Sequence, residues 1–167
     1  MRCLPLVLLG LLATGCASSG TTTAGPADAS AAKRHHTSRP LDLAINGDGY
    51  FIVKAPGGGY LFTRLGALSV SDTGELVNED GYQLYPPVVV PDAKADVAIE
   101  SDGAVRLRST NGAGRLIGQI ALARFDKPDA VQRDREYLMP LDADSVPITG
   151  KPGAKGLGTI VVGEIED

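Results

Sequence analysis

Short apolar runs separated by turn residues dominate the chain after residue 40. The segment 41–53, LDLAINGDGYFIV, opens this pattern: Leu, Leu and Ile alternate with Asp, Ala and Asn, the period-two pattern of a half-buried strand. The residues at 46–49, Asn-Gly-Asp-Gly, tolerate positive φ, and 50–53 are residues that favour strands. Together these features predict a β-hairpin.

Further strand candidates follow at short spacing. The longest runs from Leu116 to Phe125, with Gly118 in a place typical of a β-bulge, and 157–165 alternates more weakly. Only residues 128–135 favour a helix, of one or two turns. Short strands bounded by Gly, Pro, Asn, Asp and Ser predict an all-β domain, a small barrel or sandwich of antiparallel strands and hairpins. The other candidates are 60–63, 67–70, 75–77, 82–85, 88–90, 97–100 and 104–107.

The first fifteen residues form a separate apolar segment. Arg2 precedes an almost wholly apolar run from Cys3 to Leu12, and Ala-Thr-Gly stands before Cys16. The run is too short to span a bilayer, and small residues at its end are typical of a secretory leader. We therefore expect residues 1–15 to be a signal peptide that takes the chain out of the cytoplasm.

Cys16 is the candidate modification site. The ending Leu-Ala-Thr-Gly-Cys resembles the bacterial lipoprotein signal, in which the cysteine becomes the lipidated first residue of the mature chain, although Ala13 stands where that signal usually has Leu. Ala17, in place of the Asp typical of inner-membrane retention, favours the periplasmic face of the outer membrane. The alternative is ordinary cleavage nearby, which leaves Cys16 a free thiol.

Residues 16–40 have the composition of a tether. The part up to residue 32 is mostly Ala, Ser, Thr and Gly, and it has too few side chains to bury to offset the entropy of ordering. A basic stretch at 33–39 follows and contains His35 and His36. Two adjacent histidines make a weak metal site, so we favour a solvated basic patch near lipid headgroups. The folded domain is then expected at 41–167.

Charge and chemistry narrow the function classes. The chain has 16 basic and 20 acidic residues, and removing the leader with its one Arg leaves 15 against 20, or net −5. That balance argues against nucleic-acid binding, which needs a clustered basic surface. Both histidines lie in the tether, and no Ser has a plausible His partner in the domain. We therefore expect no enzyme, metal, cofactor or small-molecule substrate.

Two pairs of carboxylates are the remaining candidates for acid–base chemistry. Asp142 and Asp144 lie on one loop, and Glu164 and Glu166 lie near residue 167. At both places we expect solvated charges instead of acid–base catalysts. The Asp-Gly pairs indicate turns, not calcium, because no twelve-residue loop closed by a bidentate Glu follows them.

The tyrosines are candidates for an interface, whose position is otherwise unknown. Because the domain has few other aromatic residues, we favour core or half-buried positions for them. They are Tyr50, Tyr60, Tyr82 and Tyr85.

Six segments resemble, in the same order, the central domain of the bacterial flagellar rod and hook proteins, the axial family of the basal body. LDLAINGDGYF at 41–51 resembles its opening segment, and FTRLGAL at 62–68 resembles its Tyr-Thr-Arg-x-Gly-x-Phe motif. Each motif is weak alone, but the ordered set is specific. The other segments are 74–77 with 80–82, 99–105, 118–125, and 152–159 with Gly163 and Glu166.

The resemblance implies a structural role. In that family, helices flank this domain and pack together in the polymer, whereas here a leader and tether precede it and the sequence stops at Asp167, about where a second helix would begin. We therefore expect that this chain has no helices that pack into the polymer. We also expect that it reaches the basal body from the periplasm. The expected function is a non-enzymatic structural or accessory part of the flagellar basal body, with rod, hook or ring proteins as partners. The alternative is a periplasmic lipoprotein that binds the cell wall or another envelope protein and has no flagellar role.

Overall fold

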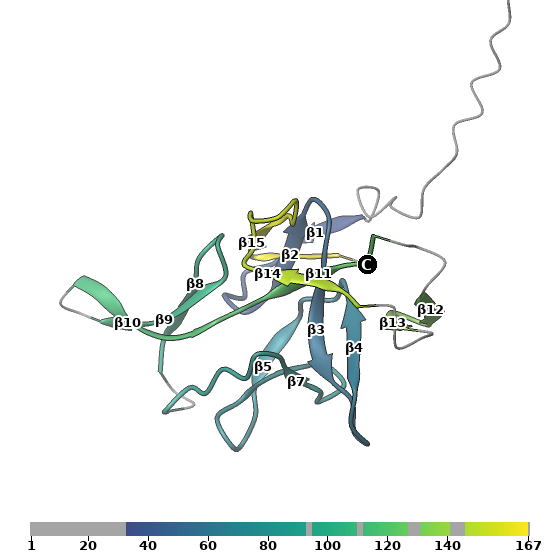
Figure 1. Cartoon of the computed structure of the whole chain (residues 1–167). Helices are drawn as coiled ribbons and strands as arrows, with labels where there is room; N and C mark the ends of the chain where they lie inside the picture. Colours follow the sequence, from purple (N-terminus) through teal and green to yellow (C-terminus); the bar gives the residue numbers. More distant parts are fainter. Residues whose placement is uncertain (1–32, 93–94, 110–111, 127–130, 141–145, 167) are drawn as a thin grey trace, which may run out of the picture.

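The computed structural model describes residues 33–92, 95–109, 112–126, 131–140 and 146–166, and all regular elements within these ranges are β-strands. The strands pair antiparallel in several small sheets around one core (Figure 1). The expected all-β class is confirmed, in the form of a sandwich and not of a closed barrel, for the described part of the chain. The strands are β1 (Arg34–His36), β2 (Leu43–Asn46), β3 (Tyr50–Lys54), β4 (Tyr60–Thr63), β5 (Leu68–Val70), β6 (Leu76–Asn78), β7 (Gln83–Leu84), β8 (Val97–Ile99), β9 (Ala104–Ser109), β10 (Gly112–Gln119), β11 (Leu122–Arg124), β12 (Val131–Asp134), β13 (Tyr137–Pro140), β14 (Ile148–Gly150), β15 (Thr159–Val162) and β16 (Glu164–Glu166).

Strand β3 is the centre of the largest sheet. It pairs with β4 along one edge, while its other edge pairs first with β11 and then with β7. The sheet continues from β4 to β13 and β12, from β7 to β6 and β5, and from β11 to β14. Since β3 has neighbours on both edges, it is the strand on which the two halves of the sheet meet.

Both faces of β3 are covered by side chains. Phe51 and Val53 point into the main core, and Ile52 points into a second cluster with Phe62 and Leu138 on the opposite face. A strand covered on both faces has a continuous apolar run instead of an alternating one. This explains why residues 50–53 are Tyr-Phe-Ile-Val.

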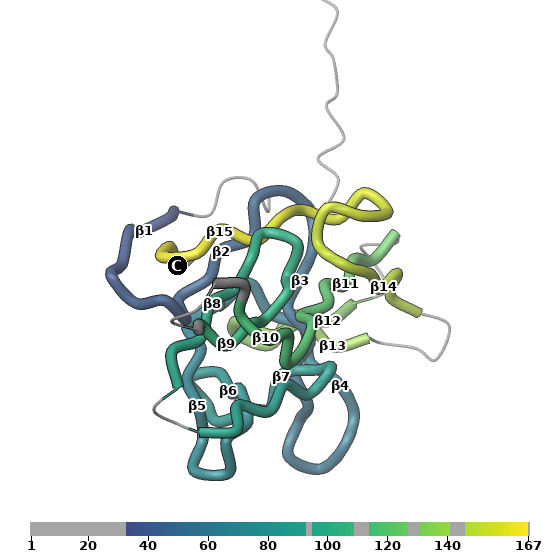
Figure 2. Tube along the Cα trace, turned by 90° about the vertical axis from the view of Figure 1, so that its left-hand side faces the viewer, coloured from purple at the N-terminus to yellow at the C-terminus, as the bar shows by residue number. Residues whose placement is uncertain are grey.

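Three smaller sheets complete the domain. Strands β8, β9 and β10 form an arm that extends to the left in Figure 1. Strand β2 pairs with β15, and β1 pairs with β16 from Arg34↔Glu166 to His36↔Glu164. Figure 2 shows β1 and the C-terminal end close together beside β2 and β15. The segment before the domain and the end of β16 are therefore held on the same side of the molecule.

The predicted hairpin at 41–53 is wrong in its pairing. The turn has the expected positive φ, at Gly47 and Gly49, but β2 leaves it to pair with β15 while β3 joins the large sheet. The backbone carbonyl of Asp48 accepts a hydrogen bond from the amide of Gly158 at 2.6 Å. Leu43, Ala44 and Ile45 are all buried, so β2 gains more cover between two sheets than a simple hairpin would provide.

Three other expectations change. The segment Leu116 to Phe125 is two strands, since β10 ends at Gln119 and β11 begins at Leu122 in another sheet; the register shift beside Gly118 confirms the bulge. In the stretch expected to be helical, Val131–Asp134 is strand β12, because pairing with β13 overrides local propensity. Residues 34–36, assigned to the tether, form strand β1 on β16.

The turns between the strands contain glycines with positive φ, as turn residues at these places indicate. The loop at Gly57–Gly59 closes the β3–β4 hairpin, and all three of its glycines have positive φ. Gly74 and Gly81 end the β5–β6 and β6–β7 turns with backbone hydrogen bonds to Ser71 and Asn78. The strand candidates 97–100 and 104–107 pair with each other as the β8–β9 hairpin.

Candidate interaction surfaces

Cys16, the predicted lipidation site, lies outside the described residues, as do Asp142 and Asp144. Lipidation of Cys16 therefore stays a prediction. In the ranges that the structure covers, there is no helix with the length and apolar character needed to cross a membrane. In the same ranges, no three or more His, Cys, Asp or Glu side chains are grouped so as to hold a metal ion.

A half-buried arginine ties distant parts of the domain together. Arg64 directly follows β4, and its Nε and Nη2 donate to the two carboxylate oxygens of Glu166 at 2.6 and 2.7 Å. Its Nη1 donates to the carbonyls of Gly47 and Gly49 at 2.8 and 2.9 Å, and Nη2 donates to that of Ile45 at 2.9 Å. A planar guanidinium can hold two carboxylate oxygens and several carbonyls at once. Arg64 therefore fixes the β2–β3 corner against β16.

The expectation that Glu166 is a solvated charge is wrong. Its side chain is only 1% exposed, and Arg34 on β1 adds a second cation, with its Nε 3.7 Å from Oε1. Glu164 has the more ordinary role, with its carboxylate 3.4 Å from Nε2 of the exposed His36. Sequence reasoning missed the Arg64–Glu166 pair, although both residues lie in the segments that resemble the flagellar family. We call this group, Arg34, Arg64 and Glu166, the arginine clamp.

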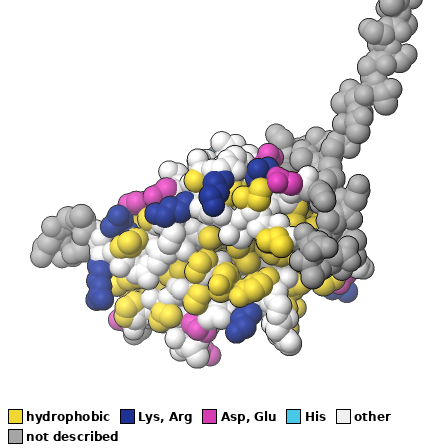
Figure 3. Space-filling model, in the orientation of Figure 1, with side chains coloured by type: hydrophobic (Ala, Val, Ile, Leu, Met, Phe, Trp, Pro, Cys, Tyr) yellow, Lys and Arg dark blue, Asp and Glu magenta, His cyan; other side chains and the backbone are white. Residues whose placement is uncertain are grey.

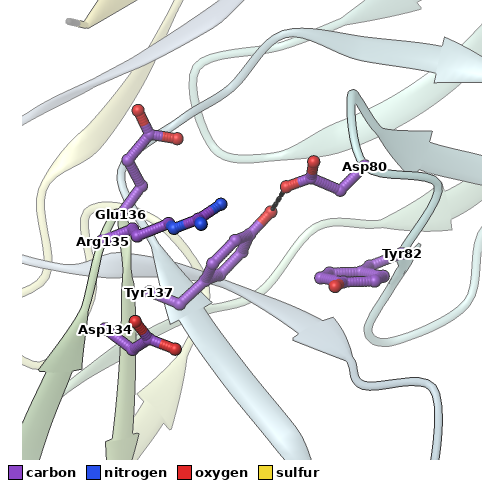
Figure 4. Close-up of a pocket in the computed structure, with 6 residues that line it drawn as sticks. All are labelled: Asp80, Tyr82, Asp134, Arg135, Glu136 and Tyr137. Atoms are coloured by element: carbon purple, nitrogen blue, oxygen red, sulfur yellow. Dashed lines mark hydrogen bonds between the residues drawn. The ribbon is translucent and has the colours of Figure 1, made fainter.

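A surface hollow of about 330 Å³ lies between the β6–β7 turn and the β12–β13 hairpin. Tyr82 and Tyr137 contribute aromatic rings whose centroids are 5.5 Å apart, and Figure 4 shows the charged side chains around them. The charged lining residues are Asp80, Asp134, Arg135 and Glu136.

Tyr137 is held in its neutral form inside this hollow. Its hydroxyl donates to a carboxylate oxygen of Asp80 and accepts a hydrogen bond from Nδ2 of the buried Asn78 at 2.7 Å. Partial burial and the hydrogen bond to Asp80 raise the pKa of Tyr137 above its ordinary value, and the Asn78 donor opposes them only in part. The Asp80 carboxylate is thereby oriented, and the β6–β7 turn is attached to the β12–β13 hairpin.

The four candidate tyrosines divide into two pairs. Tyr50 and Tyr82 are half-buried, as expected, and each packs against another aromatic ring. Tyr60 and Tyr85 are exposed, at 45% and 40%, so the expectation of half-buried positions is wrong for them. Their rings are tilted against each other at a centroid distance of 4.6 Å, and the hydrogen bond with Tyr85 raises the pKa of Tyr60.

Exposed apolar side chains also gather on one face of the molecule. In Figure 3 they cover the middle of that face, and charged side chains lie toward the arm and along the upper and lower edges. Two large aliphatic side chains are about half exposed: Val89, on the segment after β7, and Leu116, on β10. A rim of charge around an apolar centre is typical of surfaces that contact other proteins.

Comparison with known proteins identifies the domain. Residues 44–107 match the family described as "Flagellar hook protein FlgE/F/G D1 domain". The chain is 34% identical to the flagellar basal-body rod protein FlgG of Caulobacter vibrioides over 127 residues, which are 75% of this chain and 48% of that protein. It is 32% identical to FlgG of Bacillus subtilis over 136 residues (78% and 51%), and 28% identical to the rod protein FlgF of Salmonella typhimurium over 134 residues (75% and 51%).

The chain spans about half the length of these curated relatives. The matched region reaches well beyond residues 44–107, since it covers at least three quarters of the chain. The antiparallel sheets, the ordered motifs and the similarity all concern the same part of the molecule, the β domain. The β domain of this chain is therefore a central domain of the flagellar rod and hook type.

Proposed function

We propose that this protein is a non-enzymatic structural or accessory component of the bacterial flagellar basal body. The observation that supports the proposal is the match of its β domain to the D1 domain of flagellar hook and rod proteins, together with 34% identity to a rod protein. The chain acts by presenting this domain to flagellar partners during assembly or in the finished motor.

The proposal includes a lipid anchor on Cys16. Residues 1–15 are the signal peptide, Cys16 becomes the acylated first residue, and the segment that follows is a tether to the β domain. Several acyl chains on one cysteine make a stable anchor, because a single chain binds a membrane only marginally. Because β1 is paired with β16, we place the end of the tether before Arg34. The domain then works at the periplasmic face of the outer membrane.

The partners in this proposal are the rod, hook or ring proteins of the basal body. The domain docks on them from the side through surface side chains. The exposed Tyr60–Tyr85 pair and the hollow at Tyr137 are two surfaces that carry aromatic groups, and aromatic residues are enriched at the energetic centres of interfaces.

Purification of intact basal bodies from cells that carry a tagged copy tests this function. The tag is expected to co-purify with basal bodies, and Cys16→Ser is expected to reduce or abolish co-purification because the domain is no longer held at the membrane. A tag found only in outer-membrane fractions free of basal bodies would refute the flagellar role. That result would favour the alternative, an envelope lipoprotein that binds the cell wall or another envelope protein.

A further inference from the structure

We propose that the hollow between the β6–β7 turn and the β12–β13 hairpin is a receptor for an arginine side chain presented by a protein partner. The inference deepens the proposed function and rests on it only for the identity of the partner, since the chemistry of the hollow stands by itself. The lining carries the three carboxylates of Asp80, Asp134 and Glu136 against one cation, Arg135.

The shape and chemistry of the hollow select a basic group. Tyr82 and Tyr137 offer ring faces inclined at 52° to each other, and a cation is attracted to the face of an aromatic ring. The volume of about 330 Å³ is at the lower limit of small-molecule pockets, so it suits one side chain better than a larger ligand. A planar guanidinium can stack on a ring and still donate to a carboxylate at the rim.

The carboxylates at the rim are available for such a partner. Asp80 uses one oxygen to hold the Tyr137 hydroxyl, which leaves its other oxygen without a hydrogen bond to the residues that the structure describes. Asp134 and Glu136 are exposed, and neither forms an ion pair within the described ranges. Three acidic groups around an aromatic floor give the negative potential that an incoming cation requires.

Arg135 is the cation in the lining of the hollow. Its side chain extends beside the Tyr137 ring in Figure 4, and within the described part of the chain it pairs with none of the three carboxylates. It has a φ of 54°, a conformation that L side chains rarely adopt. Because Arg135 is exposed and unpaired with these carboxylates, an external guanidinium competes with it for the carboxylates and for the Tyr137 ring.

Amide NMR titration of the full-length protein in detergent micelles, with N-acetyl-arginine amide as the probe, tests the inference directly. We expect saturable shifts confined to the amides of residues 80–82 and 134–137, and weaker binding at high salt, because exposed charges are screened. Asp134→Asn with Glu136→Gln should weaken binding roughly tenfold, since each exposed charge contributes up to a few-fold. Arg135→Gly replaces the competing cation with a residue that tolerates the positive φ, and the loss of this like charge should strengthen binding about threefold.

Matched controls make the result decisive. Asp72→Asn removes an exposed carboxylate on the β5–β6 turn, away from the hollow, and should leave binding unchanged. The uncharged probe N-acetyl-citrulline amide should bind much more weakly. Absence of saturable shifts, shifts spread over the whole surface, or unchanged binding in Arg135→Gly would each overturn the inference.

The same variants separate this inference from the flagellar role. If the wild-type tag co-purifies with basal bodies and the Asp134→Asn, Glu136→Gln variant co-purifies equally well, the receptor is refuted while the proposed function stands. If the wild-type tag does not co-purify, the function is refuted, and the titration still reports on the hollow. A reduced yield of the double variant in basal bodies, with a normal yield of Asp72→Asn, supports both.

Discussion

Replacing Arg64 by Ala should destabilise the domain more than any surface charge does. The change removes the two hydrogen bonds to Glu166 and three to the carbonyls of Ile45, Gly47 and Gly49. It also leaves the Glu166 carboxylate, 1% exposed, with Arg34 at 3.7 Å as the remaining cation among the residues that the structure describes. Breaking a buried ion pair by removing one partner costs about 3–5 kcal/mol, and we expect about 4 kcal/mol here.

Urea unfolding followed by circular dichroism measures this loss. For a slope of about 2 kcal/mol per M, a loss of 4 kcal/mol lowers the unfolding midpoint by about 2 M. Arg106→Ala is the matched control, because Arg106 also pairs with a glutamate, Glu100, but at side-chain exposures of 36% and 50%. Exposed pairs contribute about 0–1 kcal/mol, so this variant should unfold close to the wild type.

The double variant Arg64→Ala, Glu166→Ala tests whether the charge pair itself is responsible. Because the stranded carboxylate is absent from the double variant, it should be less destabilised than the sum of the two single variants, with a coupling of at least about 1 kcal/mol. The reasoning is refuted if Arg64→Ala loses less than about 1 kcal/mol, or if the two single effects simply add.

Three further changes test other parts of the fold. Gly66→Ala would place a methyl group 1.9 Å from a backbone oxygen of β2, so we expect it to abolish stable folding in the urea assay, whereas Gly81→Ala, with φ +78° but open space, should cost only about 1 kcal/mol. Because the pKa of Tyr137 is raised, the native state keeps a proton that the unfolded chain loses, and the unfolding free energy falls as pH rises above about 10. Tyr137→Phe should flatten this decline, measured by unfolding followed with circular dichroism. Equal declines in the variant and the wild type would contradict the reasoning. Phe51→Ala removes a side chain that is 0% exposed and should cost about 4 kcal/mol, measured by thermal unfolding.

The turns could be predicted from sequence because their chemistry is local. A glycine that must take positive φ, such as Gly74 or Gly81, is recognised from its immediate neighbours, and the all-β class follows from the spacing of such turns. Strand pairing is different, since the partner of β2 is β15, more than one hundred residues away in the sequence. No local pattern distinguishes that pairing from a hairpin with β3.

The break between β10 and β11 shows a second limit of local patterns. Residues 116–125 form one continuous strand candidate, but Ile120 is buried at the point where the chain passes from the arm to the large sheet. Val131–Asp134 was misread for a similar reason, because its conformation is set by pairing with β13. In both cases tertiary contacts decide between states of similar local free energy.

The candidate sites depend even more on distant contacts. Arg64 and Glu166 are 102 positions apart, and the carboxylate of Glu166 looks solvated until β16 is placed beside β1. The hollow combines residues 80–82 with 134–137, which no spacing rule connects. The resemblance to flagellar proteins marked both Arg64 and Glu166 as motif residues, but only the structure shows that they form one group.

The pairing of β1 with β16 determines how the domain responds to mechanical load. A pull on the chain ahead of Arg34 reaches the Arg34↔Glu166 pair first, so the short pair opens one hydrogen bond at a time instead of resisting as a unit. Peeling residues 34–39 away would lengthen the connection by about 20 Å, at roughly 3.3–3.6 Å per residue. The next attachment is at Asp42, whose carbonyl accepts a hydrogen bond from the amide of Gly163 at 2.7 Å. Arg64 still holds Glu166 at this stage. Under tension, the chain before the domain can thus lengthen before the core is strained.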